Sequence, residues 1–168
     1  VKRAIECGIK TLGFTDHTPF MLPNGYQSAF RIPSKKAQEY VEDLKALKEK
    51  YKDKIEILIG SEVEYYPEYF NNTFANLKAL GVEFLILGQH FVFPETSKTQ
   101  HVVNGSENKE LLCEYVNRTI EGMKTKKFTY VAHPDMYLFF VTNSLWITEN
   151  NTANNSIFKN MGFAMDNS

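Results

Sequence analysis

Four short apolar runs in this sequence each lead into a side chain that can bind a metal ion. In chain order, the segments that follow the runs are Asp16-His17, Ser61-Glu62, Gln89-His90 and His133-Pro134-Asp135. Imidazole nitrogens and carboxylate oxygens are common ligands of divalent cations in proteins. Because ligand-type residues recur four times at one kind of position, the pattern predicts a metal site made of His17, Glu62, His90 and His133.

The types of ligand in this set narrow the chemistry. Nitrogen and oxygen donors without thiolates suit Zn²⁺, Mn²⁺ or Fe²⁺ better than an iron–sulfur cluster. A site that holds several such ions usually activates water for hydrolysis, often of a phosphoester. The set therefore favours a hydrolase that acts on a phosphorylated substrate.

Each of these residues also has an ordinary structural interpretation. A hydrogen-bonded loop histidine would explain His17, and a satisfied core histidine would explain His90. Glu64 lies two residues after Glu62, and the two carboxylates would share one side of an extended chain. A solvated strand end explains Glu64 equally well. His101 follows no apolar run and is interpreted as an ordinary loop residue.

The elements expected to position the ligands are buried strands separated by amphipathic helices. Short apolar runs bounded by turn residues are typical of strands buried on both faces, and here they occupy residues 11–15, 55–60, 84–88 and 128–132. Apolar residues recur at helical spacing in segments that begin near Ser34, Pro67 and Glu107. Helical connections imply parallel strands, and a parallel α/β barrel carries its functional groups where the strands end.

Three local signals refine this outline. Ser34 is expected to cap its helix, because a serine oxygen accepts hydrogen bonds from the first free amides. Gly81 is expected to end the following helix. Pro134 is expected to hold His133 in an extended conformation, which would keep the imidazole at the strand end.

Composition limits the class of protein. The chain has 168 residues, of which 43% are hydrophobic, enough to build one domain with a real core. Its net charge of −1 provides no basic field for nucleic acid. No apolar run reaches the length of a membrane span, and two cysteines are too few for a disulfide framework. We therefore expect a cytoplasmic protein that acts without a membrane or nucleic acid.

Both ends of the sequence depart from a regular series of strands and helices. The first eight residues fit the end of a helix with Gly8 as its terminal glycine, and no strand precedes them. The last residues are rich in asparagine and show no amphipathic period. We expect a partial domain over residues 1–140, truncated at both ends, and an atypical tail over residues 141–168.

Four segments together resemble the polymerase and histidinol phosphatase (PHP) family, nearest its histidinol-phosphatase branch. They are GFTDH (13–17), IGSEVEYYPEY (59–69), LGQHF (87–91) and VAHPD (131–135). The resemblance implies an α/β fold, a distorted TIM-like (β/α)7 barrel with parallel strands. The barrel would be incomplete here, because the family's opening His-x-His motif and closing Asp-x-His motif are absent from this sequence.

The same resemblance implies roles for the four predicted ligands. Glu62 would bridge two metal ions, His90 and His133 would complete the ligands of one of them, and His17 would bind another. Catalytic roles would fall to Glu62, His90 and His133. The cofactors would be divalent Zn, Mn or Fe ions, multinuclear in intact relatives.

Three further residues receive supporting roles from the resemblance. Asp16 and Glu64 would hold the ligands in place without binding metal themselves. Arg31 would bind the substrate phosphate, a role that suits the guanidinium group geometrically. The alternative for Arg31 is an ordinary surface arginine.

The implied activity is that of a histidinol-phosphatase, which converts L-histidinol phosphate to L-histidinol and phosphate in histidine biosynthesis. Its partner would be this small phosphorylated substrate. Two alternatives stay open from the sequence. One is another PHP-family phosphoesterase or a polymerase-associated nuclease domain. The near-zero net charge speaks mildly against binding of nucleic acid, and so against the nuclease domain only. The other is an inactive fragment with no enzymatic function.

Overall fold

The computed structural model describes residues 1–19, 25–95, 101–102 and 108–136. The asparagine-rich segment 141–168 and the expected helix start at Glu107 lie outside these residues.

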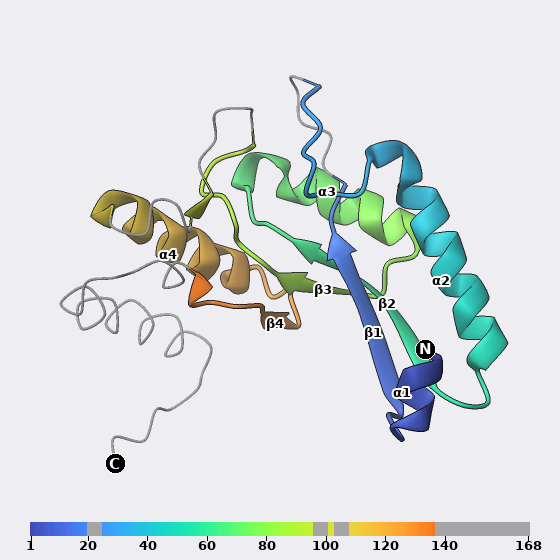
Figure 1. Ribbon diagram of the computed structural model, residues 1–168. Coiled ribbons are helices and arrows are strands. Elements are labelled where there is room, and N and C mark those ends of the chain that lie inside the picture. The colour runs from blue at the N-terminus through green and yellow to red at the C-terminus, as the bar shows by residue number, and fades with distance from the viewer. Residues whose placement is uncertain (20–24, 96–100, 103–107, 137–168) are drawn as a thin grey trace, which may run out of the picture. The chain divides into compact units, whose positions relative to one another are not determined.

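Strands alternate with helices along the described chain (Figure 1). The elements are α1 (Lys2–Glu6), β1 (Thr11–His17), the 3₁₀ turn η1 (Ser34–Lys36), α2 (Ala37–Tyr51), β2 (Glu56–Val63), α3 (Pro67–Leu80), β3 (Phe84–Leu87), α4 (Lys109–Lys124) and β4 (Tyr130–Val131). This order is the βαβ arrangement of parallel strands predicted from the sequence.

The four strands form one sheet in the order β1-β2-β3-β4. In the parallel pair of β1 and β2, Thr11 lies opposite Glu56 and His17 lies opposite Glu62. Neighbours in the sheet are therefore neighbours in sequence, as in a barrel and unlike a doubly wound sheet, where the order reverses. The sheet of the described residues is not closed, so the prediction of an incomplete α/β barrel is confirmed.

Helix ends follow local chemistry, with one correction. Pro67 opens α3 as predicted, since its missing N–H is not needed there. Gly81 ends α3 with a φ of 102°, a left-handed conformation that glycine adopts without strain. The prediction that Ser34 caps α2 is wrong. Ser34 begins the 3₁₀ turn η1, and α2 starts three residues later with Lys36 at its N-cap and no capping side chain.

The described chain divides into two compact units. The first comprises the described residues of 1–63 and 67–86, with β1, β2, α2, α3 and most of β3. The second comprises residues 64–66 and the described residues from 87 to 136. In the second unit, a core cluster joins α4 to the chain beyond β3. Its members are Val92, Val102, Leu112, Tyr115 and Val116.

The two faces of β2 differ in the first unit. Ile57 and Ile59 are buried on the face over which α2 packs. On the other face, the ring of Phe84 lies over Gly13 and Gly60, so close that a Cβ at Gly60 would be 2.5 Å from it. The two glycines thus make room for the aromatic ring. The ring covers the same face of the sheet that carries His17 and Glu62, at positions earlier along the two strands.

Strand lengths differ from the sequence prediction in a way that matters for the site. β1 continues to His17 and β2 to Val63, so His17 and Glu62 belong to the strands and not to the loops that follow. The last predicted strand, 128–132, shrinks to the two residues of β4. Its link to the sheet includes the amide of Ala132, which donates to the carbonyl of Leu87 at 2.8 Å.

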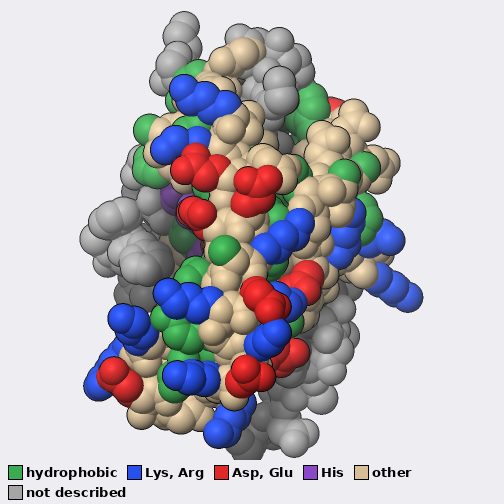
Figure 2. Space-filling view, turned by 90° about the vertical axis from the view of Figure 1, so that its right-hand side faces the viewer, with side chains coloured by type: hydrophobic (Ala, Val, Ile, Leu, Met, Phe, Trp, Pro, Cys, Tyr) green, Lys and Arg blue, Asp and Glu red, His purple; other side chains and the backbone are tan. Residues whose placement is uncertain are grey.

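In the part of the chain that the structure describes, no helix has the length and apolarity needed to cross a membrane. On the face shown in Figure 2, acidic and basic side chains are interspersed. In the first unit, Lys48 Nζ lies 2.5 Å from Glu83 Oε1. The mixture agrees with the near-zero net charge of the sequence.

Candidate metal centre

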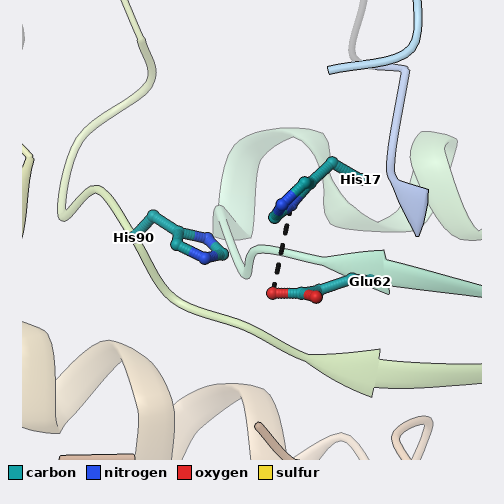
Figure 3. Close-up of side chains that lie close together, drawn as sticks. All are labelled: His17, Glu62 and His90. Atoms are coloured by element: carbon teal, nitrogen blue, oxygen red, sulfur yellow. Dashed lines mark ion pairs between the residues drawn. The ribbon is translucent and has the colours of Figure 1, made fainter. Parts of the chain in front are cut away.

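His17 and Glu62 point toward each other from neighbouring parallel strands (Figure 3). Their side chains share a face of the sheet because the two residues are in register. His17 Nδ1 lies 3.9 Å from Glu62 Oε1, and the Glu62 side chain is only 13% exposed. The first unit thus brings together two of the predicted ligands.

The spacing of this pair is close to that of two ligands on one cation. Zn²⁺ lies about 2.0–2.2 Å from histidine nitrogens and carboxylate oxygens, so two such atoms on a tetrahedral ion are about 3.4 Å apart. The observed 3.9 Å is about half an ångström longer than this spacing. As donors, an imidazole and a carboxylate fit Zn²⁺, and the same donors suit Mn²⁺ or Fe²⁺.

Asp16 and Ile32, the residue after Arg31, both form hydrogen bonds with the backbone of His17. Asp16 Oδ1 accepts a hydrogen bond from the His17 amide at 2.7 Å, which fixes the local backbone. The amide of Ile32, next to Arg31, donates to the His17 carbonyl at 3.4 Å. Arg31 is buried, so the alternative of an ordinary surface arginine is wrong. Its role in binding phosphate stays a prediction.

Glu64 and His90 form the centre of a polar network in the second unit. Glu64 is 2% exposed, and its Oε1 lies 3.0 Å from His90 Nδ1. Tyr66, also buried, donates a hydrogen bond to Glu64 Oε2. An ionised carboxylate only accepts hydrogen bonds, so this contact places the His90 proton on Nδ1 and the lone pair on Nε2. In that tautomer, Nε2 is the nitrogen with a lone pair available to a metal ion.

Gln89 fixes the chain on both sides of this network. Its side-chain oxygen accepts from the Tyr65 amide at 2.9 Å, and its amide nitrogen donates to the Phe91 carbonyl at 2.7 Å. Gln89 is 1% exposed. Gln89, the residue before the predicted ligand His90, therefore links residue 65 to the segment that carries His90 through buried hydrogen bonds.

The ring of His133 lies 4.9 Å from that of His90, centroid to centroid. The expectation that Pro134 holds His133 extended is wrong, because the φ of His133 is +34°. A proline disfavours the right-handed helical conformation of the residue before it, and here the chain takes the left-handed region instead. A turn stabilises this conformation: Met136 donates to the His133 carbonyl at 3.0 Å, and Tyr115 Oη donates to the Pro134 carbonyl at 2.8 Å.

His101 lies outside helices and strands, as its interpretation as a loop residue requires, yet it is not remote from the predicted ligands. Its ring lies 5.6 Å from that of His90 and 5.0 Å from that of Phe91. Burial lowers the pKa of His101, the charges of His90 and His133 lower it further, and Glu64 opposes them. The ordinary sequence context of His101 gave no signal of this placement.

Other residues near the predicted ligands also escaped the sequence analysis. Tyr66 is two residues beyond Glu64, so alternation in an extended chain could have placed both on one side. Thr18 and Ser61 adjoin His17 and Glu62 in sequence and are buried. Hydroxyl residues beside a ligand are too common to be singled out without the structure.

The family model described as PHP domain matches residues 1–166. Two curated relatives carry the name probable histidinol-phosphatase. The one from Deinococcus radiodurans is 24% identical over 123 residues, which cover 71% of this chain and 42% of the relative. The one from Schizosaccharomyces pombe is 27% identical over 155 residues, which cover 83% of this chain and 50% of the relative. The chain spans about half the length of the curated relatives it matches.

Two crystal structures share the fold. A candidate histidinol phosphatase from Listeria monocytogenes matches with a TM-score of 0.65 at 14% identity, covering 94% of this chain and 71% of that one. Histidinol phosphate phosphatase from Lactococcus lactis matches with a TM-score of 0.66 at 20% identity, covering 95% and 60%. The Lactococcus crystal contains zinc, L-histidinol and phosphate. At these identities, the likeness shows a common fold.

Proposed function

The chain belongs to the PHP domain family, and on that basis we propose that it is a metal-dependent phosphoester hydrolase whose substrate is L-histidinol phosphate. The products are L-histidinol and phosphate. In this proposal His17, Glu62, His90 and His133 bind divalent metal ions, and Glu62, His90 and His133 are the catalytic residues.

The observation that carries the proposal is the position of His17 opposite Glu62. A histidine and a carboxylate that face each other at 3.9 Å on adjacent parallel strands have the donors for a divalent cation at close to the spacing it requires. A packing role alone does not require two ligand-type residues in register at the carboxyl ends of the strands. Barrel enzymes use that end of their strands for catalysis.

The second unit supports the proposal through its own contacts. Glu64 accepts the Nδ1 proton of His90, which is the usual way in which a carboxylate orients a metal-binding histidine. This contact supports the orienting role that we propose for Glu64. The ring of His133 next to His90 adds a second imidazole of the ligand set.

Divalent cations bound in such a site supply positive charge toward the phosphoester and an activated water. The chain's own residues then have separable tasks. Glu62 contributes negative charge, which favours binding of a divalent cation. Arg31, buried near the His17 backbone, is proposed to hold the phosphate group of the substrate, because a guanidinium can donate two parallel hydrogen bonds to it.

The substrate and the setting are the finer parts of the proposal. The names of the two curated relatives support L-histidinol phosphate and a role in histidine biosynthesis. The interspersed charges on the face shown in Figure 2 form no extended basic area of the kind that binds nucleic acid. Cys7 and Cys113 are free and exposed, which suits the reducing cytoplasm that we propose as its location.

The test is to measure phosphate release by the purified chain with Zn²⁺, Mn²⁺ or Fe²⁺ in separate reactions. L-Histidinol phosphate, other small phosphomonoesters and single-stranded DNA are compared as substrates. We expect the highest kcat/KM for L-histidinol phosphate. A preference for another monoester or for DNA would reject the proposed substrate while leaving a hydrolase, and no turnover with any metal would reject the hydrolase.

A matched pair of variants tests the site. Glu62 and Glu56 both lie on β2 and face the same side, but Glu56 is exposed at the far end of the strand and accepts from Thr11 Oγ1 at 2.8 Å. We expect Glu62→Gln to reduce metal retention and turnover by at least about 100-fold, the upper end of what even ligand-orienting residues cost. Glu56→Gln should leave both unchanged. Equal losses in the two variants would contradict the assignment.

A further inference from the structure

At the ends of β1 and β2, two hydroxyl side chains lie on the face of the sheet opposite to the face that carries His17 and Glu62. Side chains alternate between the two faces of a strand, so Thr18 and Ser61 face the side opposite to that pair. Ser61 lines a small cavity there together with Tyr40 of α2. All of these residues belong to the first unit.

Thr18 and Ser61 are almost inaccessible to solvent, with exposures of 0% and 2%. Their hydroxyl oxygens are 2.8 Å apart. Thr18 Oγ1 lies 2.7 Å from the carbonyl oxygen of Glu62, and the Thr18 amide donates to the same oxygen at 2.9 Å. Ser61 Oγ lies 3.2 Å from the carbonyl oxygen of Asp16. The two side chains thus link the end of β1 to the end of β2 by hydrogen bonds.

The protons available to these two hydroxyls can be counted. Each hydroxyl donates once. If Thr18 donates to the Glu62 carbonyl, Ser61 donates to Thr18; if Thr18 donates to Ser61, Ser61 donates to the Asp16 carbonyl. Both arrangements end on the backbone of Glu62 or of the residue before His17. A buried hydroxyl pair with two satisfied arrangements gives a stable link in either one.

Tyr40 adds a third link from α2. Its hydroxyl donates to the Gly60 carbonyl at 3.1 Å and accepts from the Asp16 amide at 3.3 Å. It therefore contacts β1 one residue before His17 and β2 two residues before Glu62. Burial raises the pKa of Tyr40; the Asp16 amide lowers it and the charge of Asp16 raises it.

We propose that Thr18, Ser61 and Tyr40 are positioning residues that fix the separation and orientation of His17 and Glu62 for metal binding. We call these three residues the hydroxyl brace. The inference rests on the proposed function, since it assumes that the facing pair binds a cation. It adds residues that touch neither metal nor substrate, and it assigns their effect to the backbone at the ends of β1 and β2. Orienting groups of this kind change metal affinity by about 10–100-fold.

The test compares hydroxyl deletions in the whole chain. Thr18→Val keeps the shape of the side chain and removes its hydrogen bonds. Thr18→Ser is the conservative variant, because serine keeps the hydroxyl that forms them. Tyr40→Phe is the second deletion, in case Thr18→Val does not fold. Thr119→Val is the matched control, because Thr119 is also 0% exposed and its hydroxyl donates to the Tyr115 carbonyl within α4 at 2.9 Å. Two quantities are measured: the Kd for Zn²⁺ by competition with a chromophoric chelator, and amide hydrogen exchange at His17 and Glu62 without metal.

We expect Thr18→Val and Tyr40→Phe to raise the Kd for Zn²⁺ about tenfold and to speed exchange at the His17 and Glu62 amides. Thr18→Ser should return both quantities to wild-type values, and Thr119→Val should change neither. Wild-type affinity and exchange in the deletion variants would overturn the inference, as would an equal loss of affinity in the control. If the wild-type chain binds no Zn²⁺, the proposed function fails, and the exchange rates alone decide whether the brace orders the pair.

Discussion

Glu64 and His90 meet as a buried carboxylate–imidazole pair, with His90 Nδ1 3.0 Å from Glu64 Oε1. Glu62, two residues earlier, faces His17 instead. The two neighbouring carboxylates therefore have different partners. Glu64 is engaged by the proton of one imidazole, whereas Glu62 faces His17 at a distance that a cation can fill.

This difference predicts unequal effects on metal binding. We expect Glu62→Gln to lower the metal content of the purified chain more than Glu64→Gln does. The first change removes a proposed ligand charge; the second removes an orienting group, which costs about 10–100-fold in affinity. Metal content per chain, measured after dialysis against a fixed Zn²⁺ concentration, checks the order. Equal metal content in both variants would contradict it.

The hydroxyl of Tyr66 should contribute to stability through Glu64. Tyr66→Phe removes a buried donor to a carboxylate that is 2% exposed. A buried acceptor that loses a partner costs about 1–3 kcal/mol. Urea unfolding of Tyr66→Phe should show a loss of this size. Tyr130→Phe is the control, because Tyr130 is 50% exposed and surface changes usually cost less than about 0.5 kcal/mol. A loss no greater than that of the control would refute the prediction.

The glycines under Phe84 should not tolerate a side chain. In Gly60→Ala the new Cβ would lie 2.5 Å from the Phe84 ring and 2.8 Å from Thr15 Cγ2, and in Gly13→Ala it would meet only the ring, at 2.9 Å. Overpacking typically costs about 1–3 kcal/mol. We expect both variants to lose stability in urea unfolding, Gly60→Ala more than Gly13→Ala.

A second change tests the cause of that loss. Phe84→Leu shortens the side chain above the glycine, so Gly60→Ala should cost less in that background. A double-mutant cycle measures the coupling between the two positions. Purely additive effects would show that the Phe84 ring is not what excludes the methyl group.

Glu83 should make stability depend on pH. Partial burial raises the pKa of Glu83, but hydrogen bonds from Lys48 and from the Ile59 amide, together with the charges of Lys48 and Lys78, lower it overall. A carboxyl whose folded pKa is lowered stabilises the fold above its unfolded pKa, about 4.3, and loses that contribution as pH falls through the folded value. We therefore expect the free energy of unfolding to fall below about pH 4.3.

The variant Lys48→Met tests that assignment. It removes the partner that lies 2.5 Å from Glu83 Oε1, so the drop in stability toward acid pH should become shallower. The slope of unfolding free energy against pH, from urea titrations between neutral and acid pH, is the measurement. An unchanged slope would show that other carboxylates account for the acid sensitivity. The effect should be modest, because the pair is partly exposed.

The regular part of the fold was predictable because each element had strong local signals. Pro67 and Gly81 mark the two ends of α3 by backbone chemistry that acts within one turn. The apolar runs marked all four strands. Their lengths were less predictable: β2 includes Ser61 and Glu62 because hydrogen bonds to β1 hold polar residues in the strand. The spacing of apolar residues in the sequence does not predict which polar residues will form such hydrogen bonds between strands.

The site was predictable only in part, for a similar reason. His17 and Glu62 come from parallel strands, and register brings together residues at equivalent strand ends. The conformation of His133 could not be predicted, because a preference of the residue before proline yields to the turn around it. His101 and Tyr40 reach their neighbours from a loop and a helix, so only tertiary packing places them.

The end of β2 presents different chemistry on its two sides, with Glu62 forward and Ser61 and Val63 behind. The function of this strand therefore depends on which face each residue occupies, as well as on which residues it contains. Inserting one residue before Ser61 would turn the carboxylate toward the helices and a hydroxyl toward His17, whereas inserting two would restore the original sides. Insertions or deletions of two residues in this strand should therefore be tolerated far better than those of one residue. In the connecting loops, it should not matter whether the number of inserted residues is even or odd.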